Sequence, residues 1–306
     1  MRQKRIYNNL RIRAEIIRLI RRFFFEKNYL EVETPIRIPA PIPEAHIDPV
    51  ESDGWCLHAS PEICMKQLMA SGYGEIFQIA KVFRKHERGH KHLPELTMLE
   101  WYTKGDTYLD LMMQLEEMIL FICINLKKSP LIEYDNKNID ATLPFNRLSV
   151  EKAFGKYADI PMTQALDEDS FDELMGLSIE PQLGFDKPVF LYDYPAEKGS
   201  LARLKASDGR YAERFELYIA GIELCNGFSE LTDPIEQKKR FLAEQAIRKN
   251  NGHKLYPLPE KFLNALSNMP DCAGVAFGID RLVMLFTDSD TIDDVVAFTP
   301  EDLEDA

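Results

Sequence analysis

The 306 residues predict an α+β fold, in which helices and strands are mixed along one chain. Apolar side chains over 10–25 recur about every 3.6 residues with charges between them, which indicates an amphipathic helix. Several short apolar segments separated by polar loops indicate strands. Two of these segments, within 214–228, meet at Ala220 and Gly221, and this pattern is typical of an antiparallel hairpin.

The composition excludes several classes of protein. The longest uninterrupted apolar run, 118–124, is far shorter than the roughly 18 residues that a membrane span requires, and no apolar secretory stretch follows the basic start. The five cysteines are scattered without a CxxC pair, which favours reduced thiols over a zinc site or a disulfide framework. We therefore expect a soluble, cytoplasmic protein without a membrane partner.

The net charge of −13 works against unspecific attraction to nucleic acid phosphates. The helix over 10–25 is nevertheless rich in arginine, and a local basic patch can bind RNA on an acidic protein. A solvated helix face is the simpler interpretation of these arginines. The charge therefore argues mildly against a tRNA partner.

The first helix is followed by a proline-rich arm. Asn28 ends the helix, and four prolines over 30–43 exclude a helix and disfavour a regular central strand. The elements predicted after the arm are a short strand from Trp55, a helix over 61–71, strands over 75–84 and 95–102, a helix over 108–126, strands over 189–195 and 214–228, and a glycine-rich segment over 274–286 that ends as an apolar helix. The stretch 127–186 is the least informative, with weak helical signals around 171–177, and we interpret it as an insertion.

The predicted hairpin carries two carboxylates on one face. Glu223 lies opposite Tyr218 across the turn, and Glu216 shares a face with Tyr218 because strand side chains alternate with a period of two. Two nearby carboxylates repel each other unless a cation lies between them, and Mg²⁺ bound to a nucleotide is the usual cation of this kind. A solvated, charged hairpin is the alternative.

The loop between the strands over 75–84 and 95–102 gathers cationic side chains. They are Arg84, Lys85, Arg88, His90, Lys91 and His92. Such groups can bind phosphate oxygens, and arginine can do so in bidentate fashion. A metal site ranks lower, because His86, His90 and His92 lack the spacing of a zinc site. An ordinary solvated loop also remains open.

A glycine-rich turn precedes the last predicted helix. Gly274 and Gly278 allow the backbone to approach a flat ligand closely, and Arg281 at the start of the helix can lie across that ligand. Taken alone, such a turn is a weak signal.

In order, these segments resemble the three signature motifs of class II aminoacyl-tRNA synthetases. FFFEKNYLEVETP (23–35), FQIAKVFRK through LTMLEWY (77–102) and GVAFGIDRLVML (274–285) resemble motifs 1, 2 and 3. ASPE (59–62), YPAEKGSLARL (194–204) and GIELCNGFSELTDP (221–234) are similar to the lysyl enzymes in particular. The closest resemblance is to truncated lysyl-type paralogues that attach (R)-β-lysine to a lysine of elongation factor P, because motif 1 begins too near the start of the chain for a preceding anticodon-binding barrel.

The resemblance implies one class II catalytic domain over 1–306, an antiparallel β-sheet flanked by helices, with 127–186 as an insertion between motifs 2 and 3. It implies a homodimer formed through motif 1, with ATP as a substrate and Mg²⁺ as a cofactor. The expected ligase reaction has two steps. The carboxylate of (R)-β-lysine, or of lysine, attacks ATP to give an aminoacyl-adenylate and pyrophosphate, and a lysine of elongation factor P then displaces AMP. A tRNA partner is not expected.

The resemblance also assigns roles to residues. Arg84 and Arg281 would be catalytic, and Glu216 and Glu223 would bind Mg²⁺. The residues implied for the amino acid pocket are Ser60, Pro61, Glu62, Glu100, Tyr102, Glu230 and Ala276. The residues implied for the ATP site are Arg84, Lys85, His86, Glu87, His92, Leu93, Leu96, Glu223, Leu224, Gly278 and Arg281. An acidic pocket suits a diamino acid, because such a substrate carries two cations.

Four positions differ from the family's pattern. His86 stands where class II enzymes usually carry Glu, and Glu87 follows one residue later. Leu93 and Leu96 replace an Asn that contacts ATP and a Phe that stacks on adenine. Ala276 replaces a glycine, and one methyl on a pocket floor can change discrimination by on the order of 1 kcal/mol. Two alternatives therefore stay open: activation for another acceptor, such as tRNA or a metabolite, and a catalytically silent paralogue that binds an amino acid.

Overall fold

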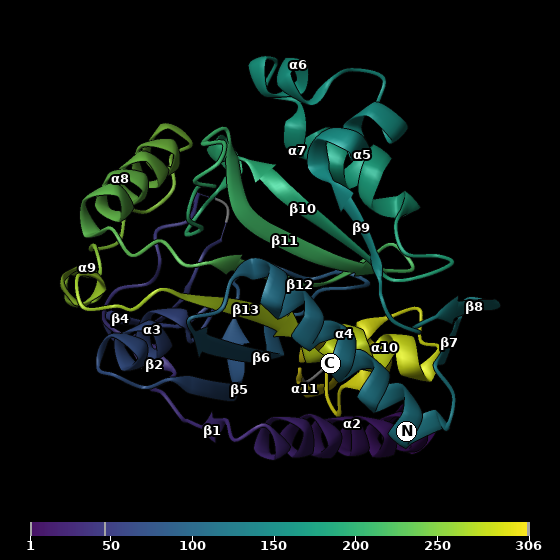
Figure 1. Ribbon diagram of the computed structural model, residues 1–306. Helices are drawn as coiled ribbons and strands as arrows, with labels where there is room; N and C mark the ends of the chain where they lie inside the picture. Colours follow the sequence, from purple (N-terminus) through teal and green to yellow (C-terminus); the bar gives the residue numbers. More distant parts are fainter. Residues whose placement is uncertain (1, 46, 305–306) are drawn as a thin grey trace.

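The computed structural model describes residues 2–45 and 47–304, and within these ranges the centre of the protein is one eight-stranded sheet (Figure 1). Its strands lie in the order β1 (Leu30–Glu31), β5 (Glu75–Phe83), β6 (Glu95–Lys104), β13 (Cys272–Gly278), β12 (Ile222–Ser229), β11 (Tyr211–Ile219), β10 (Val189–Pro195) and β9 (Asn146–Ser149). Neighbouring strands from β5 to β10 are antiparallel, whereas the edge strands β1 and β9 pair in parallel. The predicted antiparallel sheet is confirmed.

One face of the sheet is covered by α2 (Tyr7–Glu26), α4 (Tyr108–Lys127) and α10 (Ile279–Thr287) (Figure 1). These helices share the main hydrophobic core with the inward side chains of the strands. The first of them is the helix predicted over 10–25, and it ends before Asn28, whose backbone is left-handed with a φ of 63°. None of the helices in the described ranges is long and apolar enough to cross a membrane.

A second group of helices packs beside the proline-rich arm. It consists of α3 (Glu62–Ala70), α8 (Pro234–Asn250) and α9 (Glu260–Leu266), which bury a smaller apolar cluster. The arm is mostly irregular, as its prolines require, and it contributes to a small sheet of β2 (Arg37–Ile38), β3 (Val50–Ser52) and β4 (Trp55–Leu57). Short helices α1 (Arg2–Arg5) and α11 (Pro300–Leu303) lie near the two ends of the described chain.

The hairpin predicted within 214–228 is present as β11 and β12. Ala220 and Gly221 form its turn with φ values of 52° and 67°, the left-handed pair that matches the twist of a two-residue hairpin. Tyr218 lies opposite Glu223, as the sequence predicts. A bulge between Leu217 and Tyr218 shifts the register at this point.

The stretch 127–186 joins the main sheet and adds a helical layer beside it. A hairpin of β7 (Leu131–Tyr134) and β8 (Lys137–Asp140) precedes β9. The chain continues as α5 (Val150–Tyr157), α6 (Met162–Asp167), α7 (Phe171–Leu174), a π-helical stretch (Met175–Ile179) and a short 3₁₀ turn (Glu180–Gln182). Phe154 and Phe171 stack at 5.0 Å between ring centroids in a separate apolar cluster, which reaches Tyr218 of β11.

An aromatic cluster anchors α2 on the sheet. The Phe24 ring stacks on Phe77 of β5 at 4.8 Å between centroids and lies 5.2 Å from Trp101 of β6 and 5.1 Å from Tyr29. Its side chain is 1% exposed. Because Phe24 touches both strands, it ties the helix to the sheet at the point where the proline-rich arm leaves the helix.

We expect Phe24→Ala to lower the free energy of unfolding by about 3–5 kcal/mol, because the substitution removes the contacts of the Phe24 ring with its aromatic neighbours and leaves a buried cavity. Urea denaturation at equilibrium measures the change. Phe298→Ala is the control, since Phe298 is 56% exposed, and it should change the same quantity by no more than about 0.5 kcal/mol. Equal losses in the two variants would contradict the anchoring role of Phe24.

Candidate active site

Two cavities adjoin on the sheet. The large cavity, about 360 Å³, is lined from the β5–β6 loop, β12, β13 and the start of α10. The small cavity, about 110 Å³, lies toward α3 and is lined by residues that include Ser60, Glu62 and Tyr102. Arg84 and Ala276 line both cavities. A molecule in the large cavity can therefore meet a molecule in the small cavity at this junction.

Arg84 presents a cation to the junction. Its backbone N–H donates to the Pro94 carbonyl over 2.9 Å, which fixes the residue at the end of β5. The guanidinium Nε is buried without a hydrogen-bond partner among the described residues, and the Glu87 carboxylate lies 3.7 Å from Nη1. A buried donor of this kind favours an anionic guest.

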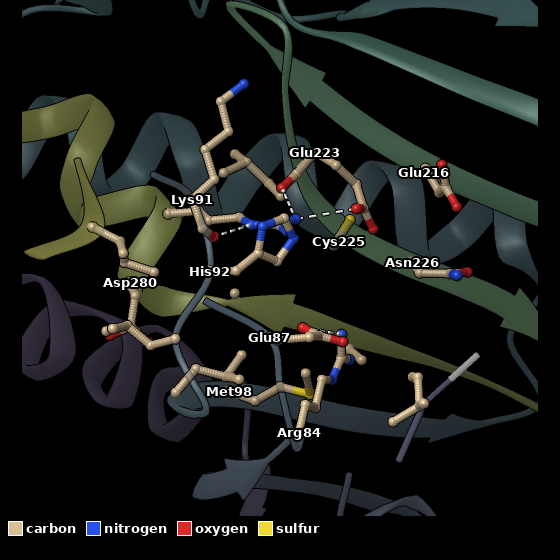
Figure 2. A pocket seen from close by; sticks show the side chains of 18 of the residues that line it. Arg84, Glu87, Lys91, His92, Met98, Glu216, Glu223, Cys225, Asn226 and Asp280 are labelled. Atoms are coloured by element: carbon tan, nitrogen blue, oxygen red, sulfur yellow. Dashed lines mark hydrogen bonds and ion pairs between the residues drawn. The ribbon is translucent and has the colours of Figure 1, made fainter. Parts of the chain in front are cut away.

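The loop after Arg84 places Glu87, rather than His86, at the large cavity (Figure 2). His86 has a φ of 68°, and this left-handed turn leaves both Lys85 and His86 exposed and outside the cavity lining. The chain turns at His86, and the Glu87 carboxylate one residue later lines the large cavity.

Arg281 is held at one wall of the large cavity by three residues, and the first contact is from its Nε to the Lys91 carbonyl over 3.4 Å. Its Nη1 donates to the Glu223 carbonyl over 2.8 Å and to the Glu223 carboxylate over 3.0 Å. Its Nη2 lies 2.7 Å from His92 Nε2. Burial and the adjacent Arg281 lower the pKa of His92, so the neutral imidazole accepts this hydrogen bond. The planar guanidinium is thus oriented before any ligand arrives.

The remaining predicted nucleotide residues surround this wall. Leu93, Leu96, Leu224 and Gly278 line the large cavity. Leu93 is buried in the main core, so its position is fixed by packing. Leu93 and Leu96 offer an apolar surface to the cavity, at the two sequence positions where the family pattern has an amide and an aromatic ring.

Glu216 and Glu223 face the large cavity from neighbouring strands, opposite Arg84 and Glu87 (Figure 2). Glu216 accepts hydrogen bonds from Tyr194 at 2.5 Å, Tyr218 at 2.6 Å and Arg214 at 2.7 Å. Burial raises the pKa of Glu216, Arg214 opposes the shift, and repulsion from Glu223 reinforces it.

This pair fits the way proteins hold Mg²⁺, with one or two carboxylates and the phosphates of a substrate. Within 2–45 and 47–304, no three His, Cys, Asp or Glu side chains are arranged to hold a metal ion by themselves. Glu180 lies nearby, and burial together with repulsion from Glu216 and Glu223 raises its pKa to about 7. A cation at this position would relieve the repulsion among these carboxylates.

Buried acidic side chains lie at and behind the wall of the small cavity. Glu100 is fully buried, and its carboxylate accepts hydrogen bonds from Ser60 at 2.6 Å and Tyr102 at 3.2 Å. Glu230 is 1% exposed. Burial raises the pKa of Glu100 to about 8, and repulsion from Glu62 adds to the shift. Burial also raises the pKa of Glu230 to about 8, although Lys66 opposes it.

A buried lysine partly neutralises this acidic cluster. The Lys66 ammonium, 1% exposed, forms ion pairs with Glu62 and Glu230. Burial acts to lower the pKa of Lys66, but the two carboxylates outweigh it and the net shift is upward. Three carboxylates therefore face one ammonium, which leaves up to two uncompensated negative charges when all are ionised.

Gly274 and Ala276 form the floor of the small cavity on β13. A Cβ atom at Gly274 would collide with the Tyr102 ring and lie 2.6 Å from a Glu230 oxygen. The methyl group of Ala276 is accommodated between the two cavities. The strand therefore approaches the acidic cluster as closely as a backbone can.

The structure brings together most of the predicted site residues. Ser60, Glu62, Tyr102 and Ala276 line the small cavity. Glu100 and Glu230 lie behind this lining as buried charges, and Pro61 is buried where α3 begins.

Sequence reasoning missed several residues that line or support the cavities. They are Glu44, Lys66, Met98, Arg214 and Asn226. Lys66 follows Glu62 by four residues on a helix, a spacing that predicts an ion pair, so it could have been found. Glu44 lies in the irregular arm, where no periodicity indicates the direction of its side chain.

We expect Lys66→Met to lower the free energy of unfolding by about 3–5 kcal/mol at neutral pH, because it leaves buried carboxylates without their cation. Burial already raises the pKa of Glu230, and in the variant Lys66 no longer opposes that shift, so the folded state holds a proton that the unfolded state releases. The stability of the variant should therefore fall further as pH rises from about 6.5 to about 8.5. Urea denaturation at both pH values measures this.

Lys81→Met is the matched control, because Lys81 pairs with Glu95 on the surface. It should cost less than about 1 kcal/mol at either pH. A Lys66→Met loss that is as small, or that does not grow with pH, would contradict the buried ion cluster.

The chain is similar in sequence to known proteins over nearly its whole length. The model of the family "tRNA synthetases class II (D, K and N)" matches residues 1–302. A protein of Pectobacterium atrosepticum is 39% identical over 96% of this chain and 95% of its own length. Proteins of Yersinia enterocolitica (40% identical, 95% of this chain and 94% of its own) and Pseudoalteromonas translucida (39%, 94% of each) are similar. All three are named elongation factor P–(R)-β-lysine ligases. The chain therefore belongs to the class II tRNA synthetase family of the D, K and N type.

Proposed function

We propose that this protein is an ATP-dependent ligase that activates (R)-β-lysine as an aminoacyl-adenylate and transfers it to a lysine side chain of elongation factor P. The observation that carries the proposal is a cavity with buried acidic groups that adjoins a larger cavity with arginines on its walls. The names of relatives that match nearly the whole chain support the acceptor and the amino acid. ATP is the nucleotide that the family uses.

The charges of the small cavity match a diamino acid. Glu62, Glu100 and Glu230 together outnumber Lys66 by two negative charges when ionised, and (R)-β-lysine carries two ammonium groups. A neutral amino acid would leave buried carboxylates unpaired, and an acidic one would add repulsion. We expect the Ala276 methyl, at the junction of the cavities, to influence which lysine isomer places its carboxylate correctly.

Activation takes place at the junction. An oxygen of the substrate carboxylate attacks the α-phosphorus, and the bond to the pyrophosphate oxygen breaks. Arg84 donates to the α-phosphate oxygens and neutralises the charge that builds up on them. Arg281, held by Glu223 and His92, lies against the base of the nucleotide. Glu216 and Glu223 would hold Mg²⁺, which supplies charge neutralisation for the phosphates.

We further propose a homodimer formed through motif 1, as the family resemblance implies. Phe25 and Leu30 in this segment are 52% and 51% exposed, and exposed apolar side chains of this size favour burial against a second subunit. The proposal places the protein in the cytoplasm, where translation takes place.

The first experiment measures ATP–pyrophosphate exchange and AMP release with (R)-β-lysine, L-lysine and no amino acid, then with elongation factor P and with total tRNA. We expect amino-acid-dependent exchange, and a mass increase on elongation factor P. If exchange is observed but only tRNA is charged, then the acceptor is tRNA and not elongation factor P. Amino acid binding without exchange would support a catalytically silent protein.

Arg84→Ala should lower the exchange rate by about 100-fold or more, because it removes the cation at the α-phosphate. Arg88→Ala is the control from the same loop. Arg88 pairs with Asp293 and Glu301 and does not line the cavities, so its loss should leave exchange within a few-fold of the native rate. If both substitutions lower the exchange rate by a similar factor, then the loop acts only through its total positive charge and Arg84 has no specific role.

Binding of the diamino acid should release protons. In the empty site the pKa of Glu100 is about 8, so Glu100 holds a proton at neutral pH while Glu230 pairs with Lys66, and two substrate ammonium groups favour the ionised form of both carboxyl groups. The affinity for (R)-β-lysine should therefore rise with pH from about 6 to about 8.

Calorimetry in two buffers with different ionisation enthalpies measures the proton release directly. (R)-3-Aminohexanoic acid, which differs from (R)-β-lysine only in lacking the terminal ammonium, is the matched control and should bind weakly and release fewer protons. An affinity for (R)-β-lysine that is independent of pH would contradict the role of these two carboxylates.

A further inference from the structure

A third cavity, about 640 Å³, opens between the proline-rich arm and α8. We call it the α8 groove, and its lining includes Pro43, Ser200, Leu204, Phe241 and Glu244. Glu44 lines this groove and also lines both the large and the small cavity. Asn226 also lines all three cavities, so the open groove meets the place where the proposed adenylate would form at Glu44 and Asn226, and of these two only Glu44 is ionisable.

Contacts from α8 fix the backbone at Glu44 and directly after it. Arg248, 2% exposed, donates from Nη1 to the Glu44 carbonyl over 2.8 Å and to the Ile47 carbonyl over 3.0 Å. The Ala45 N–H donates to the Glu244 carboxylate over 2.8 Å. The arm has no regular structure here, so these contacts to α8 determine where the Glu44 side chain lies.

The charges of the α8 groove favour a cationic guest. Its cations already have partners, because Arg214 pairs with Glu216, and Lys239 and Arg240 pair with Glu236. The groove also contains Glu44, Glu197 and Glu244. A lysine side chain is long, thin and positively charged at its tip, and so it fits a groove that leads to a carboxylate.

We propose that the α8 groove admits the lysine side chain of the acceptor protein and that Glu44 is the general base of the transfer step. This inference rests on the ligase function proposed above. An acceptor ammonium cannot attack until it loses a proton, and Glu44 is placed to take it.

The Glu44 carboxylate accepts one proton from the acceptor ammonium. The amine nitrogen forms a bond with the carbonyl carbon of the aminoacyl-adenylate, the bond from that carbon to the phosphate oxygen breaks, and AMP leaves with the electron pair. The nitrogen loses its second proton to water, and the product is an amide.

The environment of Glu44 suits this task. Burial raises the pKa of Glu44 to about 7, although Arg84 opposes the shift and Glu62 reinforces it. A base is most effective when its pKa lies near the working pH. The charged groups that act on Glu44 from the elements packed around it are Arg84, Glu62, Glu244 and Arg214.

The test compares acceptors that need a base with one that does not. Enzyme loaded with aminoacyl-adenylate is mixed in single turnover with elongation factor P, with Nα-acetyl-lysine amide at high concentration, or with hydroxylamine, which is largely unprotonated at neutral pH. Glu44→Gln should slow transfer to both lysine acceptors by about 100-fold while hydroxamate formation stays within a few-fold of the native rate. Glu51→Gln, an exposed carboxylate of the same region paired with Lys254, should affect none of these rates.

The pH profile supplies a second readout. Native transfer should level off above about pH 7, because Glu44 is then ionised and takes the proton itself. Transfer by the Glu44→Gln variant should keep rising with pH, because only the free amine fraction reacts. Hydroxamate formation by the variant shows that it is folded and loaded.

Each outcome decides a different statement. Native transfer rates or an unchanged pH profile in Glu44→Gln would overturn the role of Glu44 and leave the ligase function standing. If the native enzyme modifies Nα-acetyl-lysine amide but never elongation factor P, then elongation factor P is not the acceptor. The rates with the amide would still test the role of Glu44. No adenylate in the native protein would reject both.

Discussion

Lys66 is buried between two carboxylates, and the shape of the small cavity follows from this arrangement. Desolvating the three charged groups is costly, and they remain ionised only while each keeps a partner. Lys66 is held on α3, Glu62 begins the same helix, and Glu230 follows β12, so the ion cluster joins the helix to the sheet. Glu100, hydrogen-bonded to Ser60 and Tyr102, extends the cluster to β6. An acidic cavity is thus built into the packing rather than added to its surface.

The same sheet carries the large cavity, and this shared support sets the distance between the two cavities. β13 contributes Ala276 to both cavities, and its continuation into α10 presents Arg281. Glu223 on β12 lines the large cavity. Glu230, which directly follows β12, lies behind the lining of the small cavity. Because neighbouring hydrogen-bonded strands cannot shift relative to each other, the proposed nucleotide and amino acid groups are aligned without any movement of domains.

Much of the fold could be predicted from the sequence because its elements have clear periods or clear ends. The helix expected over 108–126 is observed as Tyr108–Lys127, and the strand over 189–195 has the observed bounds. The Ala220–Gly221 turn was predictable because Gly221 adopts left-handed backbone readily and strand-like segments flank it, although Ala220 also has a φ of 52°. The stretch 127–186 was not, because its elements are short and β9 depends on pairing with β10 far along the chain. The direction of His86 and the place of Glu44 also depend on tertiary contacts, which a local pattern does not contain.

Gly274 has a consequence for how the range of accepted amino acids can change during evolution or by design. Its position is closed to any side chain by Tyr102 and Glu230, so variants there lose the cavity instead of reshaping it. Two residues along the same strand, Ala276 faces the junction and has a methyl group that can be removed or enlarged. New substrate preferences in this protein would therefore be sought by varying Ala276, with Gly274 kept as the invariant half of the floor.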